Sequence, residues 1–190
     1  MRKAVRIVGV SAAALVLVTC GEGNGGGGGE GTVSAETYAQ SLCASMQAYI
    51  DEVTTLSTDF PATLDPSASL DEQRNAVLAF LDDVLAATDR LISGVEDAGV
   101  PDIDNGDQVV VALEATFAEA RGILEEARAR VETISVDDPQ VFAEQLNAIG
   151  ETIQASLGEI GSSLASLDAP ELNAAVSDHP ECAAVAGAPG

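Results

Sequence analysis

Apolar residues recur every three or four positions in four long segments of the chain. This spacing places them on one face of an α-helix. No segment alternates apolar and polar residues convincingly with period two, so the pattern predicts no β-sheet. We therefore expect an all-α protein whose main helices cover the segments Tyr38–Leu56, Val77–Val95, Val110–Ile134 and Phe142–Leu167.

Residues that start and stop helices frame these segments. Ser34 can cap the first helix, Ser69–Glu72 has the pattern of a capping box, and Gly99–Pro101 can end the second helix. Asp138–Pro139 places an acidic cap before a proline at the first helical position, and the same logic predicts a short helix at about Pro170–Ser177. Connections of several residues between long helices favour antiparallel neighbours. The sequence thus predicts an up-down antiparallel four-helix bundle with a short C-terminal fifth helix.

Residues 1–19 have the layout of a secretory signal peptide. Positively charged Arg2, Lys3 and Arg6 precede an apolar run, Ile7–Val18. This run would rise about 18 Å as a helix, which is less than the ~30 Å hydrocarbon core of a bilayer. We therefore expect an export signal and no permanent transmembrane anchor.

The end of this segment, Leu17-Val18-Thr19-Cys20, resembles the lipobox of bacterial lipoproteins. The resemblance implies that Cys20 becomes the lipid-modified first residue of the mature chain, which two acyl chains would hold at the membrane. Alternatively, the protein is secreted and Cys20 is an unpaired thiol.

The remaining chain divides into three parts. Residues 20–32 contain the lipidated cysteine and a glycine-rich stretch, which we expect to be a flexible tether with a reach of about 20 Å. Residues 33–182 form the predicted bundle domain, which is long enough for a proper core. Residues 183–190 are expected to be a disordered tail.

The net negative charge of the chain limits the classes of partner that it can bind. The chain has a formal net charge of −23, and removal of residues 1–19 leaves five arginines against 31 acidic residues, a charge of −26. Such a surface repels phosphate backbones and anionic lipid headgroups. We therefore expect no nucleic-acid partner, and contact with the membrane only through a lipid anchor.

Two cysteines remain if Cys20 is lipidated. Cys43 lies near the start of the first predicted helix, and Cys182 follows the short last helix. Two cysteines in an exported protein are expected to form a disulfide, because compartments outside the cytoplasm are oxidising. The predicted disulfide joins the two ends of the domain. Two buried thiols, or a redox or metal pair, are the alternatives.

The sequence offers few residues for catalysis. His179 is the only histidine and has no nucleophile at a recognisable spacing, and motifs for hydrolases, phosphate loops, haem or paired irons are missing. We therefore expect no enzyme activity and no cofactor. Asp102, Asp104 and Asp107 are candidate calcium ligands, although the order of the carboxylates and Gly106 does not follow an EF-hand. Their alternative role is to cap the third helix.

Two further groups of residues have a structural and a functional interpretation. Glycines in the fourth predicted helix would permit a close approach of another helix, or leave space for an apolar ligand; they are Gly150, Gly158 and Gly161. Arginines in the third helix form the only local positive cluster, and would pair with nearby glutamates or bind a ligand carboxylate; they are Arg121, Arg128 and Arg130.

The mature chain resembles small helical lipoproteins of high-GC Gram-positive bacteria, which have no assigned activity. The likeness rests on Tyr38…Cys43, the loop Ala98–Asp102 and the final element Leu172…Cys182. It implies a lipid-anchored protein on the extracytoplasmic face of the cell membrane. We expect a non-enzymatic interaction or structural protein of the envelope with an unknown protein partner. The alternative is a lipoprotein that binds a small molecule or lipid in the bundle interior, or in a groove beside the fourth helix.

Overall fold

The computed structural model describes residues 31–65, 67–165, 169–178 and 182, and the protein is all-helical apart from two very short strands. The predicted signal peptide, the Cys20 site, the tail and His179 lie outside the described residues. The elements in chain order are β1 (Thr32–Val33), α1 (Ala35–Thr63), α2 (Leu70–Asp97), β2 (Val100–Pro101), α3 (Gly106–Glu132), α4 (Pro139–Ala165) and α5 (Pro170–Asp178).

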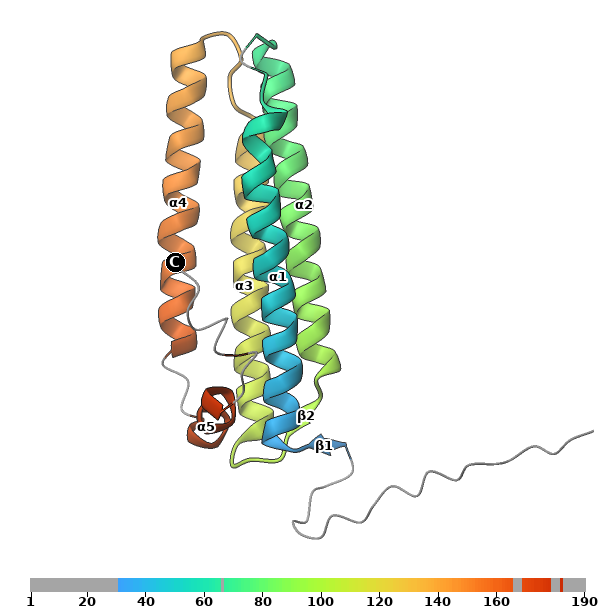
Figure 1. The fold of residues 1–190 in the computed structure, drawn as a ribbon. Helices are drawn as coiled ribbons and strands as arrows, with labels where there is room; N and C mark the ends of the chain where they lie inside the picture. Colours follow the sequence, from blue (N-terminus) through green and yellow to red (C-terminus); the bar gives the residue numbers. More distant parts are fainter. Residues whose placement is uncertain (1–30, 66, 166–168, 179–181, 183–190) are drawn as a thin grey trace, which may run out of the picture.

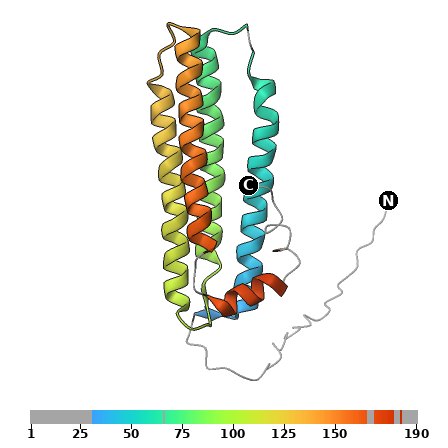
Figure 2. The same ribbon diagram turned by 90° about the vertical axis from the view of Figure 1, so that its left-hand side faces the viewer.

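The four long helices run alternately up and down, and α5 crosses beneath them (Figure 1). Each long helix packs on the next one in the chain: α1 on α2, α2 on α3, and α3 on α4. The predicted helical bundle with a short C-terminal helix is therefore confirmed. The arrangement is open on one side, because α4 stands apart from α1 and packs mainly on α3, while α5 packs against α1 (Figure 2).

The helix starts follow the predicted capping chemistry. The Ser34 side chain accepts a hydrogen bond from a backbone N–H at the start of α1. Ser69 and Glu72 form both halves of a capping box at the start of α2. The carboxylate of Asp138 accepts a hydrogen bond of 2.8 Å from the backbone N–H of Gln140, just after Pro139. These side chains satisfy N–H groups that have no partner within the helix.

The expectation that the chain contains no sheet is wrong in one place. β1 pairs with β2 in parallel register, with Thr32 opposite Val100. Two-residue strands are too short to show an alternating pattern, so the sequence carries no signal for them. Gly99 has a φ of 80° where α2 ends, and this turn directs β2 towards β1. The pair fixes the start of α1 to the connection between α2 and α3.

The apolar core consists of two clusters. The first lies at the base, the end of the bundle with β1, β2 and α5, and includes Tyr38, Leu91, Leu113 and Leu172. The second lies towards the other end, which we call the distal end, and comes from α2, α3 and α4. The buried residues of α1 all fall at Tyr38–Cys43. The rest of α1 therefore leaves its apolar face only partly covered.

Candidate functional site

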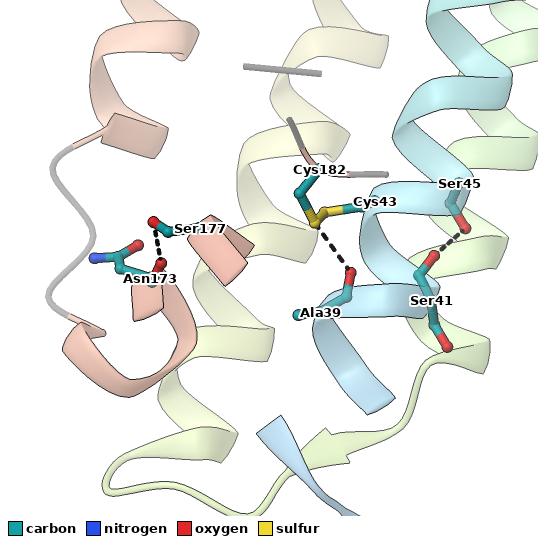
Figure 3. Close-up of a disulfide and its surroundings, with 7 residues drawn as sticks. All are labelled: Ala39, Ser41, Cys43, Ser45, Asn173, Ser177 and Cys182. Carbon is teal, nitrogen blue, oxygen red and sulfur yellow. Dashed lines mark hydrogen bonds between the residues drawn. A yellow bond between two sulfur atoms is a disulfide. The ribbon is translucent and has the colours of Figure 1, made fainter. Parts of the chain in front are cut away.

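A disulfide joins Cys43 of α1 to Cys182, as the sequence predicts. The two Cα atoms are 5.1 Å apart, within the ordinary range for a disulfide. Both cysteines are buried, and Sγ of Cys182 lies 3.8 Å from the carbonyl oxygen of Ala39 (Figure 3). The bond fixes the chain after α5 to the base of α1. Its burial and its position between two elements give it a structural role.

Tyr38 lies one turn before Cys43 and is fully buried. Its hydroxyl group has no hydrogen-bond partner among the described residues. Burial raises the pKa of Tyr38 to about 12, and the negative charge of Glu114 adds to the shift. The folded protein therefore disfavours the tyrosinate at this position.

We predict that this buried phenol makes stability fall at high pH. An unfolded tyrosine has a pKa of about 10, so between pH 10 and 12 the unfolded chain releases a proton that the folded chain retains. The free energy of unfolding should drop by about 2 kcal/mol between pH 9 and 12 from Tyr38 alone. Urea unfolding of wild type and Tyr38→Phe across this range measures the effect. Equal pH dependence of the two proteins would contradict it.

The candidate calcium residues are not brought together. Among the described residues, no three His, Cys, Asp or Glu side chains form a group that could hold a metal ion. The backbone N–H of Asp102 donates to the carbonyl of Val33 at 2.7 Å, so the loop extends the strand pairing. The N–H of Asp104 faces the Glu171 carboxylate at 3.4 Å. This loop therefore joins β1 and α5 to the bundle.

The alternative role of these aspartates, as caps of α3, needs correction. The N-cap residue is Asn105, with a φ of 63°, and its side chain makes no capping hydrogen bond. Only Asp107 lies in the first turn of α3, where its charge is favourable near the positive end of the helix dipole. The sequence could not show that the chain turns through a left-handed residue just before the helix.

Ion pairs occupy two of the three arginines of α3, Arg121 and Arg128. Arg121 contacts Glu125 of its own helix and Asp89 of α2, each at 2.6 Å. Arg128 pairs with Asp82 of α2 and more loosely with Glu132. The intrahelical pairs were expected, whereas the pairs to α2 were not. The hydrogen bond to Asp89 raises the pKa of Arg121.

Other arginines also connect neighbouring helices. Arg90 of α2 pairs with Glu52 of α1. Arg130 of α3 faces the hydroxyl of Thr152 on α4 at 3.5 Å. Exposed contacts of this kind are screened by solvent and contribute little to stability. They nevertheless place these arginines at the edges of helix interfaces, where Arg121 and Arg128 already have carboxylate partners.

The expectation that the α4 glycines allow close helix packing is wrong for Gly150 and Gly158. A methyl group at either position would meet no other atom within 4 Å, so both face open space. The surroundings of Gly161 lie outside the described residues. The close approach occurs instead at Gly94 of α2, where a methyl group would overlap the side chain of Ser45 on α1. The sequence pattern cannot distinguish these cases, because the answer depends on the facing helix.

Small depressions lie beside α4. One of about 210 Å³ is lined by residues that include Arg130, Ile134, Gln145 and Ile149, and another of about 40 Å³ lies nearby. A third, of about 200 Å³, lies between the loop before α3 and the start of α5. Sites for small molecules usually measure about 300–1,000 Å³. Each of these depressions is smaller than that range.

A fourth depression, which we call the distal pocket, lies between the end of α1 and the first half of α2. Its volume is about 160 Å³, and its lining includes Leu56, Asp59, Phe60, Ala76, Phe80 and Asp83. The rings of Phe60 and Phe80 lie 4.6 Å apart between centroids, inclined by 36°. Both rings are half-buried, whereas both aspartates are exposed.

The side-chain carboxylates of the two aspartates in the distal pocket make no hydrogen bond or ion pair with any described residue. The pocket thus combines an aromatic, apolar floor with two carboxylates that have no cationic partner. Sequence reasoning missed this site. The signal was available, because Phe60 continues the stripe that ends at Leu56, and Phe80 lies among the apolar residues of the second segment.

None of the helices in the described part of the chain is long and apolar enough to cross a membrane. No protein-family model, curated protein or solved structure matches the chain. Its function is therefore inferred from its own residues.

Proposed function

We propose that the protein is a lipoprotein, anchored through Cys20 to the extracytoplasmic face of the cell membrane, whose helical domain binds another protein. The observation that carries this proposal is the disulfide between Cys43 and Cys182. Stable disulfides are typical of oxidising compartments outside the cytoplasm. The pairing also leaves Cys20 as the one cysteine available for lipid.

The direction of the bundle is consistent with this anchoring. The glycine-rich residues 21–31 lead directly into β1 at the base, and α1 starts there. An α-helix of 29 residues is about 44 Å long, so the end of α1 lies about that far from the base. A tether at the base would therefore present the distal end to partners.

Protein binding is favoured over storage of an apolar ligand. The depressions described above have volumes between about 40 and 210 Å³. In contrast, the apolar face of α1 beyond Cys43 is only partly covered by other elements. Partly covered apolar surface with a polar rim is typical of a surface that contacts another protein.

Replacement of the proposed lipid attachment site tests the anchor. In a Gram-positive host, we expect wild-type protein in the membrane fraction and Cys20→Ser in the soluble or secreted fraction, because serine lacks the thiol that carries the lipid. Thr19→Ala is the matched control, since it changes the neighbouring residue but keeps Cys20, and it should remain with the membrane. A Cys20→Ser protein that stays in the membrane fraction would disprove the anchor.

The partner class can be tested by chemical cross-linking in intact cells. The protein is then purified from detergent-solubilised membranes, and co-purifying proteins and lipids are identified by mass spectrometry. We expect one protein to co-purify with the wild type in near-equal amount, and to be depleted when Asp59 and Asp83 are both replaced by asparagine. Recovery of a bound lipid or small molecule, and of no such protein, would favour the alternative.

A further inference from the structure

We infer that the distal pocket binds an arginine side chain of the partner protein, between the Phe60–Phe80 pair and the carboxylates of Asp59 and Asp83. This inference rests on the proposed function and names the chemistry of its partner. It makes the end of the bundle farthest from β1 the part that recognises the partner.

The pocket has the two features that a guanidinium group requires. Arginine is planar, stacks on aromatic faces and donates paired hydrogen bonds to carboxylates. The half-buried rings of Phe60 and Phe80 supply the aromatic surface. Asp59 and Asp83 lie on different helices but line the same pocket, so both can approach one cationic group.

The chain itself cannot neutralise these two carboxylates within their helices. Side chains pair along a helix when they are three or four residues apart. The positions three and four residues from Asp59 and from Asp83 carry no Lys, Arg or His. In contrast, Asp82 and Asp89 of the same helix α2 are paired with arginines of α3. None of the arginines in the described part of the chain pairs with Asp59 or Asp83, so we expect the cation that complements the pocket to come from another molecule.

The size and place of the pocket favour a side chain of a protein over a free small molecule. A volume of about 160 Å³ is below the usual range for small-molecule sites. Protein interfaces commonly concentrate their binding energy in a few residues, with arginine among the most frequent, that lie in small, well-packed pockets. The pocket lies between the end of α1 and the start of α2, where a tethered domain would meet another protein.

Fluorine NMR can test the pocket directly, because the chain contains only four phenylalanines. Phe60 and Phe80 line the pocket, whereas Phe117 and Phe142 are buried in the core and serve as internal references. The full chain is labelled with 4-fluorophenylalanine in detergent micelles, and Phe60→Leu and Phe80→Leu assign the two pocket signals. The probe is the capped peptide acetyl-Leu-Arg-Leu-amide.

We expect the arginine peptide to shift the signals of Phe60 and Phe80 in a saturable manner and to leave those of Phe117 and Phe142 unchanged. The same peptide with citrulline, the neutral isostere of arginine, should bind at least tenfold more weakly. Equal binding of both peptides, or shifts at all four signals, would overturn the assignment of an arginine site.

A charge-matched pair of variants separates local recognition from general attraction to an acidic protein. Asp59→Asn with Asp83→Asn should weaken binding of the arginine peptide at least tenfold. Asp97→Asn with Asp102→Asn removes the same two charges at the other end of α2, where both residues are exposed, and should change binding less than twofold. Equal weakening in the two double variants would refute the pocket. Membrane fractionation of Cys20→Ser is independent of this result, so the two proposals can fail separately.

Discussion

Replacement of both Cys43 and Cys182 by alanine is expected to lower the free energy of unfolding by about 2–5 kcal/mol. The two cysteines are 139 residues apart, so the disulfide closes almost the whole described domain into one loop. Chain-entropy arithmetic gives about 5 kcal/mol for a loop of this length, and measured values are commonly smaller. Urea unfolding followed by circular dichroism measures the loss, with Cys20→Ala as the control that keeps the disulfide.

The loss should be concentrated at the base of the bundle. α5 packs mainly on α1, through residues such as Leu172, and the disulfide holds the chain just after it. Without the bond, α5 can detach while α2 and α3 stay packed. We therefore expect amide hydrogen exchange in α5 to accelerate more than exchange in α3. An unchanged unfolding midpoint together with unchanged exchange in α5 would contradict this role for the disulfide.

The parts of this fold that could be predicted from the sequence are those that depend on local chemistry. The spacing of apolar residues predicts the four long helices, because a period of 3.6 is a property of each segment alone. Ser34, Ser69 and Asp138 mark helix starts for the same reason, since each caps the N–H groups that follow it. The cysteine pairing follows from the sequence once Cys20 is set aside as the predicted lipid attachment site, because only two other cysteines are present.

The features that could not be predicted depend on which atoms of a neighbouring helix or strand face a residue. The sequence gives no reason why α4 should stand apart from α1, or why Gly150 should face open space while Gly94 touches Ser45. The distal pocket is of this kind, because it forms only when the end of α1 lies beside the first half of α2. The two-residue strand pair is another case, since its register depends on the turn at Gly99.

Gly106 is an example of a residue whose role can be recognised only from its contact with another element. In the sequence it is the glycine of a possible calcium loop, whereas in the structure it is the buried first residue of α3. A methyl group there would overlap the carbonyl oxygen of Pro101 and lie 3.3 Å from its carbonyl carbon. The obstacle is backbone from β2, which cannot rotate away as a side chain can. Glycine is therefore required here because the strand pair and the start of α3 come very close together.

Gly106→Ala is accordingly expected to lower the free energy of unfolding by about 3 kcal/mol or more, at the upper end of the usual cost of overpacking. Gly122→Ala is the matched control, because Gly122 lies within α3 and a methyl group there would meet nothing within 4 Å. That change should raise stability by up to about 1 kcal/mol through better helix propensity. Urea unfolding of both variants gives the comparison. A Gly106→Ala protein as stable as wild type would show that β2 and α3 are not in close contact.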